Sequence, residues 1–291
     1  MQGTMLITDS GCDLPLQALQ DAGVELLYFP YALDGEERLD DFGVSLSYDG
    51  FCDTMRGGVR STTAQVRLPD CLAVFERACQ GGKTALLVTI SSGLSGSYET
   101  ALAAREQFLK AHPDAMIHVM DSLSVSAGQG VLVLEMAQRL KEGLSADAVV
   151  TWAEENRQRV NHLFTVDSFD YLVRGRRVQP AVGAVGGLLD IKPILHVDPE
   201  GRLALLKKLR GRKKAVTLLA DMVAERIEDA GTQTIVLDHA QCPEEAEMLR
   251  GMLAERFSAR DVISGRIGII IGTHTGPSRI VVSLLGSPRA N

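Results

Sequence analysis

Four short segments of the sequence concentrate hydroxyl, imidazole or guanidinium groups, which are the hydrogen-bond donors that a buried anion requires. They are Ser61-Thr62-Thr63, Arg174-Gly175-Arg176-Arg177, Thr273-His274-Thr275-Gly276-Pro277 and Ser91-Ser92-Gly93-Leu94-Ser95-Gly96-Ser97. The last leads from a predicted strand into a predicted helix, where free backbone N–H groups and the helix dipole favour an anion. Taken singly, each segment also has a plain structural interpretation as a turn, a solvated run of charge or a helix cap.

Taken together, these donors could receive a carboxylate group. An unpaired charge in apolar surroundings is very costly, so a buried carboxylate needs several donors and preferably one cation. The candidates are an arginine, His274 and the hydroxyls of Thr62, Thr63 and Ser95. The apolar remainder of such a ligand would need only a channel between helices and sheet, which leaves no local motif.

The common catalytic signatures are absent. Around Ser95 the second glycine of a hydrolase elbow is misplaced. The run Gly82-Lys83-Thr84 lacks the first glycine of a P-loop, because Arg77 stands there, and the apolar strand follows the run instead of preceding it. We therefore predict no catalytic residue, no metal and no cofactor.

The first half of the chain alternates short apolar runs with helical patterns. Strands are predicted over residues 5–8, 24–31, 84–90 and 116–120, with helices over 69–80, 98–111, 126–141 and 145–160. This alternation predicts an N-terminal domain, residues 1–160, built on a mostly parallel, doubly wound sheet. Ligands of such sheets bind at the carboxyl ends of the strands, where several of the polar segments fall.

The second half has a different pattern and predicts a mixed α/β domain over residues 161–291. Its predicted strands cover residues 164–166, 191–197, 202–209, 234–239, 267–271 and 280–285, and its predicted helices cover 212–230 and 244–257. The turn Asp198-Pro199-Glu200-Gly201 joins the second and third of these strands, which predicts a β-hairpin.

Composition narrows the class of protein. The chain has 291 residues, a net charge of −7 and only 5% aromatic residues, which argues against nucleic-acid binding. The five cysteines form no C-x-x-C pair, as suits a reducing cytoplasm. The N-terminus lacks a leader pattern, and no stretch approaches the roughly 18 apolar residues of a membrane span. We expect a cytoplasmic protein without stable membrane insertion.

Seven segments, in order from residue 5 to about residue 285, resemble the DegV family, whose members are bacterial fatty-acid-binding proteins. They are Ile7-Thr8-Asp9-Ser10-Gly11-Cys12-Asp13-Leu14-Pro15, Ile90-Ser91-Ser92-Gly93-Leu94-Ser95-Gly96-Ser97-Tyr98, Asp121-Ser122-Leu123-Ser124-Val125-Ser126-Ala127-Gly128-Gln129-Gly130, Tyr171-Leu172-Val173-Arg174-Gly175-Arg176-Arg177-Val178, Ile191-Lys192-Pro193-Ile194, Lys208-Leu209-Arg210-Gly211-Arg212-Lys213-Lys214-Ala215 and Ile271-Gly272-Thr273-His274-Thr275-Gly276-Pro277.

The resemblance implies a long-chain fatty acid in a tunnel between the two domains. Its carboxylate would be held by the threonine after Ser61, by Ser95 and by a network that includes His274 and Arg177. The ligand-binding residues expected on this basis are Thr62, Thr63, Ser92, Ser95, Arg177, His274 and Thr275.

The resemblance also implies a role as a carrier that is not itself an enzyme. The protein would present the acyl group to a separate ATP-dependent fatty acid kinase subunit, which makes acyl phosphate for phospholipid synthesis. Arg210 would lie near the carboxylate and the incoming phosphate. The chain departs from the family where Thr62-Thr63-Ala64-Gln65-Val66 replaces Thr-Ser-x-Pro-Ser, and where Ser278 replaces a glycine.

Residues 202–214 carry seven basic side chains and no acid: Arg202, Lys207, Lys208, Arg210, Arg212, Lys213 and Lys214. A solvated face is the plain interpretation, and docking of the kinase, with Lys213 and Lys214 facing the partner, is the functional one. Two alternative functions stay open at this point. One is a hydrolase or phosphotransferase that uses His274 as a base, and the other is a scaffold or regulator with a structural lipid.

Overall fold

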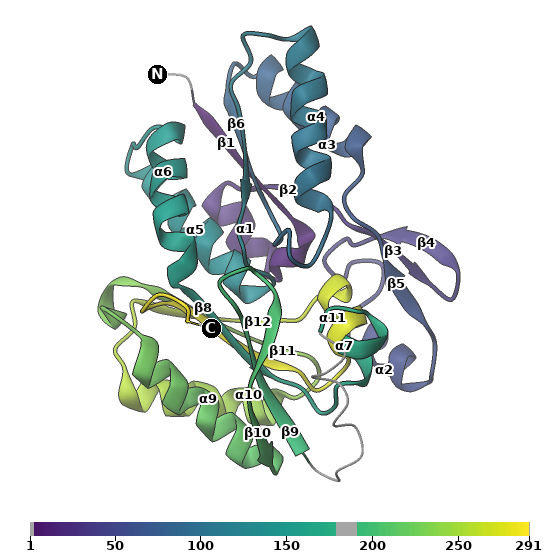
Figure 1. The fold of residues 1–291 in the computed structure, drawn as a ribbon, viewed down its shortest axis with the longest axis vertical. Helices are drawn as coiled ribbons and strands as arrows, with labels where there is room; N and C mark the ends of the chain where they lie inside the picture. The colour runs from purple at the N-terminus through teal and green to yellow at the C-terminus, as the bar shows by residue number, and fades with distance from the viewer. Residues whose placement is uncertain (1–2, 179–190, 291) are drawn as a thin grey trace.

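The computed structural model describes residues 3–178 and 191–290 and shows two α/β domains, one above the other in Figure 1. The upper domain contains a four-stranded sheet, the lower one a six-stranded sheet, and a small three-stranded sheet projects from the side of the upper domain. Within the described residues, no helix combines the length and hydrophobicity that a membrane crossing requires.

The sheet of the N-terminal domain is entirely parallel, in the order β2-β1-β6-β7. Its strands are β1 Thr4–Asp9, β2 Glu25–Leu27, β6 Thr84–Thr89 and β7 Ile117–Asp121. Helices α3 (Leu68–Gln80) and α4 (Ser97–Ala111) cover one face, and α1 (Leu16–Ala22) and α5 (Ala127–Lys141) cover the other (Figure 1). All six residues of β6 are buried, as expected for a strand covered on both faces. The predicted doubly wound parallel sheet is confirmed.

The single strand predicted over residues 24–31 is wrong, because the segment forms two strands in two sheets. After β2 the chain leaves the parallel sheet, and Pro30, which has no N–H to donate, begins β3. The backbone of Phe29 between them bonds outside any ladder, to the hydroxyl of Ser10 and the N–H of Asp40. The small sheet has the order β4-β3-β5, from β3 Pro30–Leu33, β4 Glu36–Leu39 and β5 Ser61–Thr63, with α2 Tyr48–Arg56 between β4 and β5.

The sheet of the C-terminal domain is mixed, as predicted, in the order β10-β9-β8-β13-β11-β12 with only β11 and β12 parallel. Its strands are β8 Val160–Thr165, β9 Ile191–Val197, β10 Leu203–Arg210, β11 Thr234–His239, β12 Asp261–Arg266 and β13 Ile280–Leu285. The hairpin of β9 and β10 is confirmed. The sequence analysis missed β12, a half-exposed edge strand with few apolar residues.

Helices cover both faces of this sheet. Helices α9 (Arg212–Arg226) and α10 (Pro243–Arg256) pack on one face, and α5 packs on the other. Because α5 contacts both sheets, ten of its fifteen residues are buried, the pattern of a helix enclosed on all sides. The limits 1–160 and 161–291 stay a prediction. The remaining elements are α6 Ala146–Asn156, α7 Asp170–Arg174, α11 Ile269–Thr275 and the short 3₁₀ helices Ser10–Cys12, Arg157–Arg159 and Ala230–Thr232.

The strand predicted over residues 267–271 is also wrong, because this segment begins helix α11. A short continuous apolar run does not distinguish a buried strand from a buried helix. The hydroxyls of Thr273 and Thr275 donate to the carbonyls of Ile269 and Ile271 one turn earlier. Gly276 ends the helix at a φ of +73°, where the ring of Tyr171 leaves no room for a Cβ.

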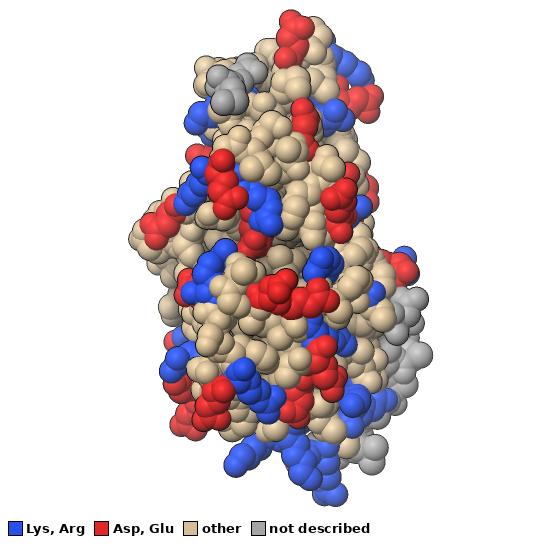
Figure 2. Space-filling model, turned by 90° about the vertical axis from the view of Figure 1, so that its left-hand side faces the viewer, with Lys and Arg blue, Asp and Glu red and all other residues tan. Residues whose placement is uncertain are grey.

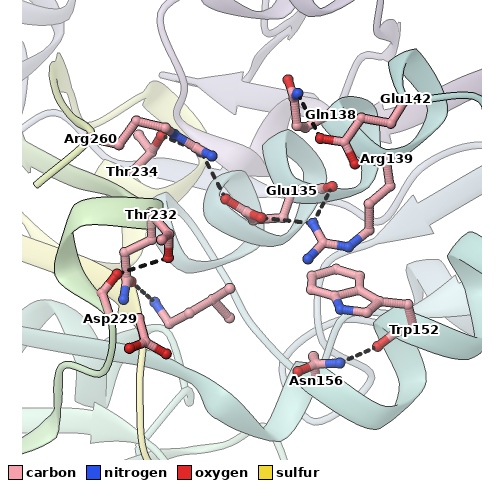
Figure 3. Close-up of polar contacts among 12 residues, drawn as sticks. Glu135, Gln138, Arg139, Glu142, Trp152, Asn156, Asp229, Thr232, Thr234 and Arg260 are labelled. Carbon is pink, nitrogen blue, oxygen red and sulfur yellow. Dashed lines mark hydrogen bonds and ion pairs between the residues drawn. The ribbon is translucent and has the colours of Figure 1, made fainter.

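An ion pair and a cation–π contact connect α5 to the C-terminal sheet and to α6 (Figure 3). The carboxylate of Glu135 lies 2.8 Å from Arg139 Nη1 and 3.0 Å from Arg260 Nη2. Arg260 also donates to Thr234 Oγ1 on β11, and the Arg139 guanidinium stacks 3.4 Å above the ring of Trp152 on α6. One carboxylate therefore connects α5, α6 and the edge of the C-terminal sheet.

Candidate functional site

A cavity lies where the carboxyl ends of the N-terminal strands meet the C-terminal sheet. Its volume is about 50 Å³, below the usual range of small-molecule sites. Its apolar walls include Phe29, Ile90, Val125, Phe164, Leu203 and Ile271. Its polar lining includes Thr63, Ser95, Arg177 and His274, which come from all four of the segments that the sequence analysis selected.

The hydrogen bond between Thr63 and His274 is the centre of the polar lining. Thr63 Oγ1 on β5 lies 2.7 Å from His274 Nε2 on α11. A second bond, 2.8 Å between the hydroxyls of Ser61 and Thr273, runs beside it. Side chains alternate between the faces of a strand, so Thr62 points the other way, is exposed and does not line the cavity.

His274 is held as a neutral imidazole. Burial, and then the positive charge of Arg177, lower the pKa of His274 to about 3. Its Nδ1 is buried and has no hydrogen-bond partner among the described residues. A Cβ on Gly175 would lie 2.4 Å from this nitrogen, so the Arg174-Gly175-Arg176-Arg177 segment can approach the ring only because residue 175 is glycine.

Ser95 lies in the loop just before α4. Its hydroxyl is 2.9 Å from the hydroxyl of Ser97 and accepts a 3.3 Å bond from the Ser97 N–H, while Gly96 is the N-cap residue. The Ser97 hydroxyl in turn accepts from the N–H of Val66, just after β5. Ser95 is therefore fixed near the positive end of a fifteen-residue helix, a favourable place for an anion.

Arg177 supplies a cation to the same lining. Its Nη1 donates to the carbonyl of Gly175 at 2.6 Å, and its Nε donates to the carbonyl of Leu94 at 3.3 Å. The side chain is about half-buried, and burial lowers its pKa. These bonds hold the guanidinium between the loop that carries Ser95 and the helix that carries His274.

Three predicted site residues have other surroundings. Thr62 is exposed, as described above. Ser92 does not line the cavity, and its backbone N–H donates to a carboxylate oxygen of Asp121. Thr275 lines the cavity, but its hydroxyl is bonded to the carbonyl of Ile271.

The basic residues predicted to face a partner lie outside the cavity. Arg210, at the end of β10, and Lys213 and Lys214, in the first turn of α9, are exposed. Lys and Arg side chains gather at the lower end of the molecule in Figure 2, the end where β9 and β10 lie in Figure 1. Arg212 behaves differently, since it is half-buried and donates to the carbonyl of Ser278.

The charged residue of the cavity wall that was not predicted from the sequence is Arg279. Its side chain is 1% exposed, the largest of the fully buried side chains among the described residues, and it lines the cavity. The available signal was a charged residue directly before the strongly apolar segment that forms β13. Its neighbour Ser278 has a φ of +69°, which explains why glycine suits that position.

Fold and site together define a class: a two-domain α/β protein with an apolar cavity between its sheets and hydroxyl, imidazole and guanidinium groups in the cavity wall. The sequence pattern of the DegV family, described as uncharacterised proteins, matches residues 4–286. A DegV domain-containing protein of Clostridium perfringens is 37% identical over 99% of both chains. This chain belongs to the DegV family.

Solved structures show the same fold. A DegV family protein from Thermus thermophilus, described for its fatty acid binding, is 27% identical, with a TM-score of 0.87 over 98% of this chain and 100% of that one. The Streptococcus pneumoniae fatty acid kinase B3 protein, loaded with linoleic acid, is 27% identical, with a TM-score of 0.84 over 98% of this chain and 100% of that one.

Proposed function

We propose that this protein binds a long-chain fatty acid, with the carboxylate among Thr63, Ser95, His274 and Arg177, and presents it to a separate ATP-dependent kinase. The observation that carries the proposal is the Thr63–His274 bond beside Arg177 at the polar wall of an otherwise apolar cavity. The solved DegV structures with bound fatty acids support it.

The polar wall matches the needs of a carboxylate. Two hydroxyls, Thr63 and Ser95, can rotate to donate to its oxygens, and the guanidinium of Arg177 balances its charge. The acyl chain would lie against the apolar walls, where each buried methylene contributes about 0.8 kcal/mol. The carboxylate and the acyl chain would thus be recognised by different parts of one cavity.

The geometry favours a carrier over a stand-alone enzyme. A general base works best when its pKa lies near the working pH, whereas the pKa of His274 is lowered to about 3. Thr63 Oγ1 lies within hydrogen-bond reach of Nε2, but among the described residues no group bonds Nδ1 to orient the ring as a base. A hydrogen-bonding role for a neutral His274 is consistent with both facts.

Phosphorylation would then take place on the bound ligand. A carboxylate oxygen attacks the γ-phosphoryl group of ATP held by the kinase, an acyl phosphate forms, and ADP leaves. The exposed basic side chains Arg210, Lys213 and Lys214 offer a docking surface for an acidic partner or for the phosphate. A partner that uses ATP would place this protein in the cytoplasm.

Mass spectrometry of the gently purified protein after denaturing extraction tests the binding step. We expect a fatty acid to be released in a roughly stoichiometric amount, and a delipidated sample to gain thermal stability when a long-chain fatty acid is added. If no fatty acid is released and none shifts the melting temperature, the protein is not a fatty acid carrier. If the acid is bound but no kinase phosphorylates it, the scaffold or regulator alternative replaces the carrier role.

A further inference from the structure

Arg279 gives the cavity a second polar feature. It precedes β13, is fully buried and lies on the wall together with Phe164, whose ring centroid is 4.5 Å from the guanidinium carbon. Among the described residues it forms no hydrogen bond with Thr63, Ser95 or His274, and the cation that lowers the pKa of His274 is Arg177. The two arginines therefore serve different parts of the cavity.

A relay of hydrogen bonds fixes the orientation of this guanidinium. Arg279 Nη2 is 2.7 Å from His162 Nε2, and the other ring nitrogen, Nδ1, is 2.9 Å from the hydroxyl of Ser283. Arginine can only donate, so Nε2 accepts the bond from Arg279. The backbone N–H of Gly128 donates to Nδ1 at 3.2 Å, which also fixes the position of the ring. Burial and Arg279 both lower the pKa of His162, which keeps the ring uncharged.

The bond to His162 does not use all the N–H donors of the guanidinium. Arg279 Nε is buried and has no hydrogen-bond partner among the described residues. Buried donors are nearly always paired, so an unpaired one on a cavity wall can pair with an acceptor on a bound ligand. This acceptor need not be an anion, because the carboxyl groups of Asp13 and Asp238 lie near the guanidinium and oppose the lowering of its pKa by burial.

We propose that Arg279 hydrogen-bonds an oxygen carried on the acyl chain, so that the cavity prefers hydroxylated or oxo fatty acids to unsubstituted ones. This inference rests on the proposed function, since it needs an acyl chain in the cavity. A hydroxyl or keto oxygen accepts the free N–H without bringing a charge into a region where burial already raises the pKa of Asp13 and Asp238. An unsubstituted chain would leave the guanidinium N–H facing methylene groups, which offer no acceptor.

The test is competition against a fluorescent fatty acid on the delipidated full-length protein. The competitors are saturated fatty acids of equal length that are unsubstituted or carry one hydroxyl or keto group at different carbons. We expect at least one positional isomer to bind about tenfold more tightly than the unsubstituted acid, the effect of one hydrogen bond from a charged donor. If the unsubstituted acid binds and no isomer exceeds it, this inference is wrong and the proposed function stands.

Two variants show whether Arg279 causes the preference. Arg279→Met keeps the approximate volume and should abolish the preference, so that hydroxylated or oxo acids bind no more tightly than the unsubstituted acid. Arg289→Met is the matched control, because Arg289 is 7% exposed and has its pKa lowered to about 10 like Arg279, but does not line the cavity. The control should keep the preference, and a preference that survives in Arg279→Met would overturn the assignment.

The test also requires that the Arg279→Met variant folds. If Arg279→Met does not fold, Arg279→Lys keeps the charge and removes the planar fork, and it should reduce the preference without abolishing binding. If neither substituted nor unsubstituted acids bind the wild type, the proposed function fails and this inference fails with it.

Discussion

The hydroxyl of Ser91 donates a 2.7 Å hydrogen bond to the carbonyl oxygen of Gly201, across 110 residues of sequence. Ser91 begins the loop that carries Ser95, and Gly201 lies at the tip of the β9–β10 hairpin, which carries the cavity residue Leu203. The contact joins the candidate carboxylate site to the strand whose far end carries the basic residue Arg210. It is a physical link between the candidate carboxylate site and the predicted docking surface.

We predict that Gly201→Ala destabilises the protein and weakens fatty acid binding. Gly201 has a φ of +74°, and a Cβ there would lie 2.1 Å from Ser91 Oγ, so the loop that carries Ser95 must shift. Gly143→Ala is the control, since Gly143 also has a positive φ but no atom within 4 Å of the added Cβ. The left-handed conformation alone costs about 1–2 kcal/mol, and urea unfolding should show a larger loss for Gly201→Ala than for Gly143→Ala. Equal losses would mean that the contact is unimportant.

Thr63→Val should reduce fatty acid affinity by about tenfold, whereas Thr62→Val should have no effect. Both changes replace a hydroxyl by a methyl on the same strand, but only Thr63 lines the cavity and bonds His274. A lost hydrogen bond to a charged group costs about 1.5–3 kcal/mol. Isothermal titration of both variants with the same fatty acid measures the two affinities. A stronger effect of Thr62→Val than of Thr63→Val would place the carboxylate on the other side of β5.

His274 should make the protein less stable as the pH falls below about 6.5. The folded-state pKa is lowered to about 3, so between these values the unfolded chain binds a proton that the folded chain does not. The free energy of unfolding then decreases by about 1.4 kcal/mol per pH unit from this group.

Denaturant titrations of the wild type and His274→Gln between about pH 7 and about pH 5 measure this slope. The stability of the wild type relative to the variant should decrease steadily over that range. A difference that does not change with pH would show that His274 is not held neutral by the fold.

Glu135→Gln should lower stability by about 1–2 kcal/mol and change the fluorescence of Trp152. Glu135 is buried, and its carboxylate pairs with Arg139 and Arg260, so removing its charge breaks both ion pairs. The loss stays moderate because both arginines are partly exposed and can turn to water once the carboxylate is gone. Trp152 is the single tryptophan of the chain, and Arg139 stacks on it. The control is Glu142→Gln at the C-cap of α5, where the carboxylate accepts a hydrogen bond from Gln138 (Figure 3). Unchanged emission in Glu135→Gln would contradict the coupling.

Reversing charge with Lys213→Glu and Lys214→Glu should slow acyl phosphate formation at least about tenfold while fatty acid affinity stays at the wild-type value. Both lysines are exposed and lie outside the cavity. The assay combines the loaded protein, ATP and a bacterial fatty acid kinase subunit, at low and high salt, because an electrostatic contact weakens with ionic strength. The control reverses exposed Lys83 and Lys110 of the N-terminal domain; equal effects of the two pairs would indicate a general charge effect without docking at α9.

Local patterns in the sequence were sufficient for the class of the fold. Strand–helix alternation predicted the parallel sheet, and Asp198-Pro199-Glu200-Gly201 predicted the hairpin, because period and turn chemistry are properties of neighbouring residues. The same local rules failed for α11, since an apolar run packs equally well as helix or strand until its surroundings are known. They also missed β12, an edge strand that buries little apolar surface.

The features of the site also divide into those that the sequence predicted and those that depended on the tertiary structure. The sequence selected Thr63, Ser95, Arg177 and His274 by the chemistry of their groups and by resemblance to a family. Only the tertiary structure decided that Thr63 and not Thr62 faces His274, 211 residues away, and that Arg279 enters the cavity wall. Which side of a strand is buried, and which charge is enclosed, depends on contacts between residues far apart in the chain. No local pattern records those contacts.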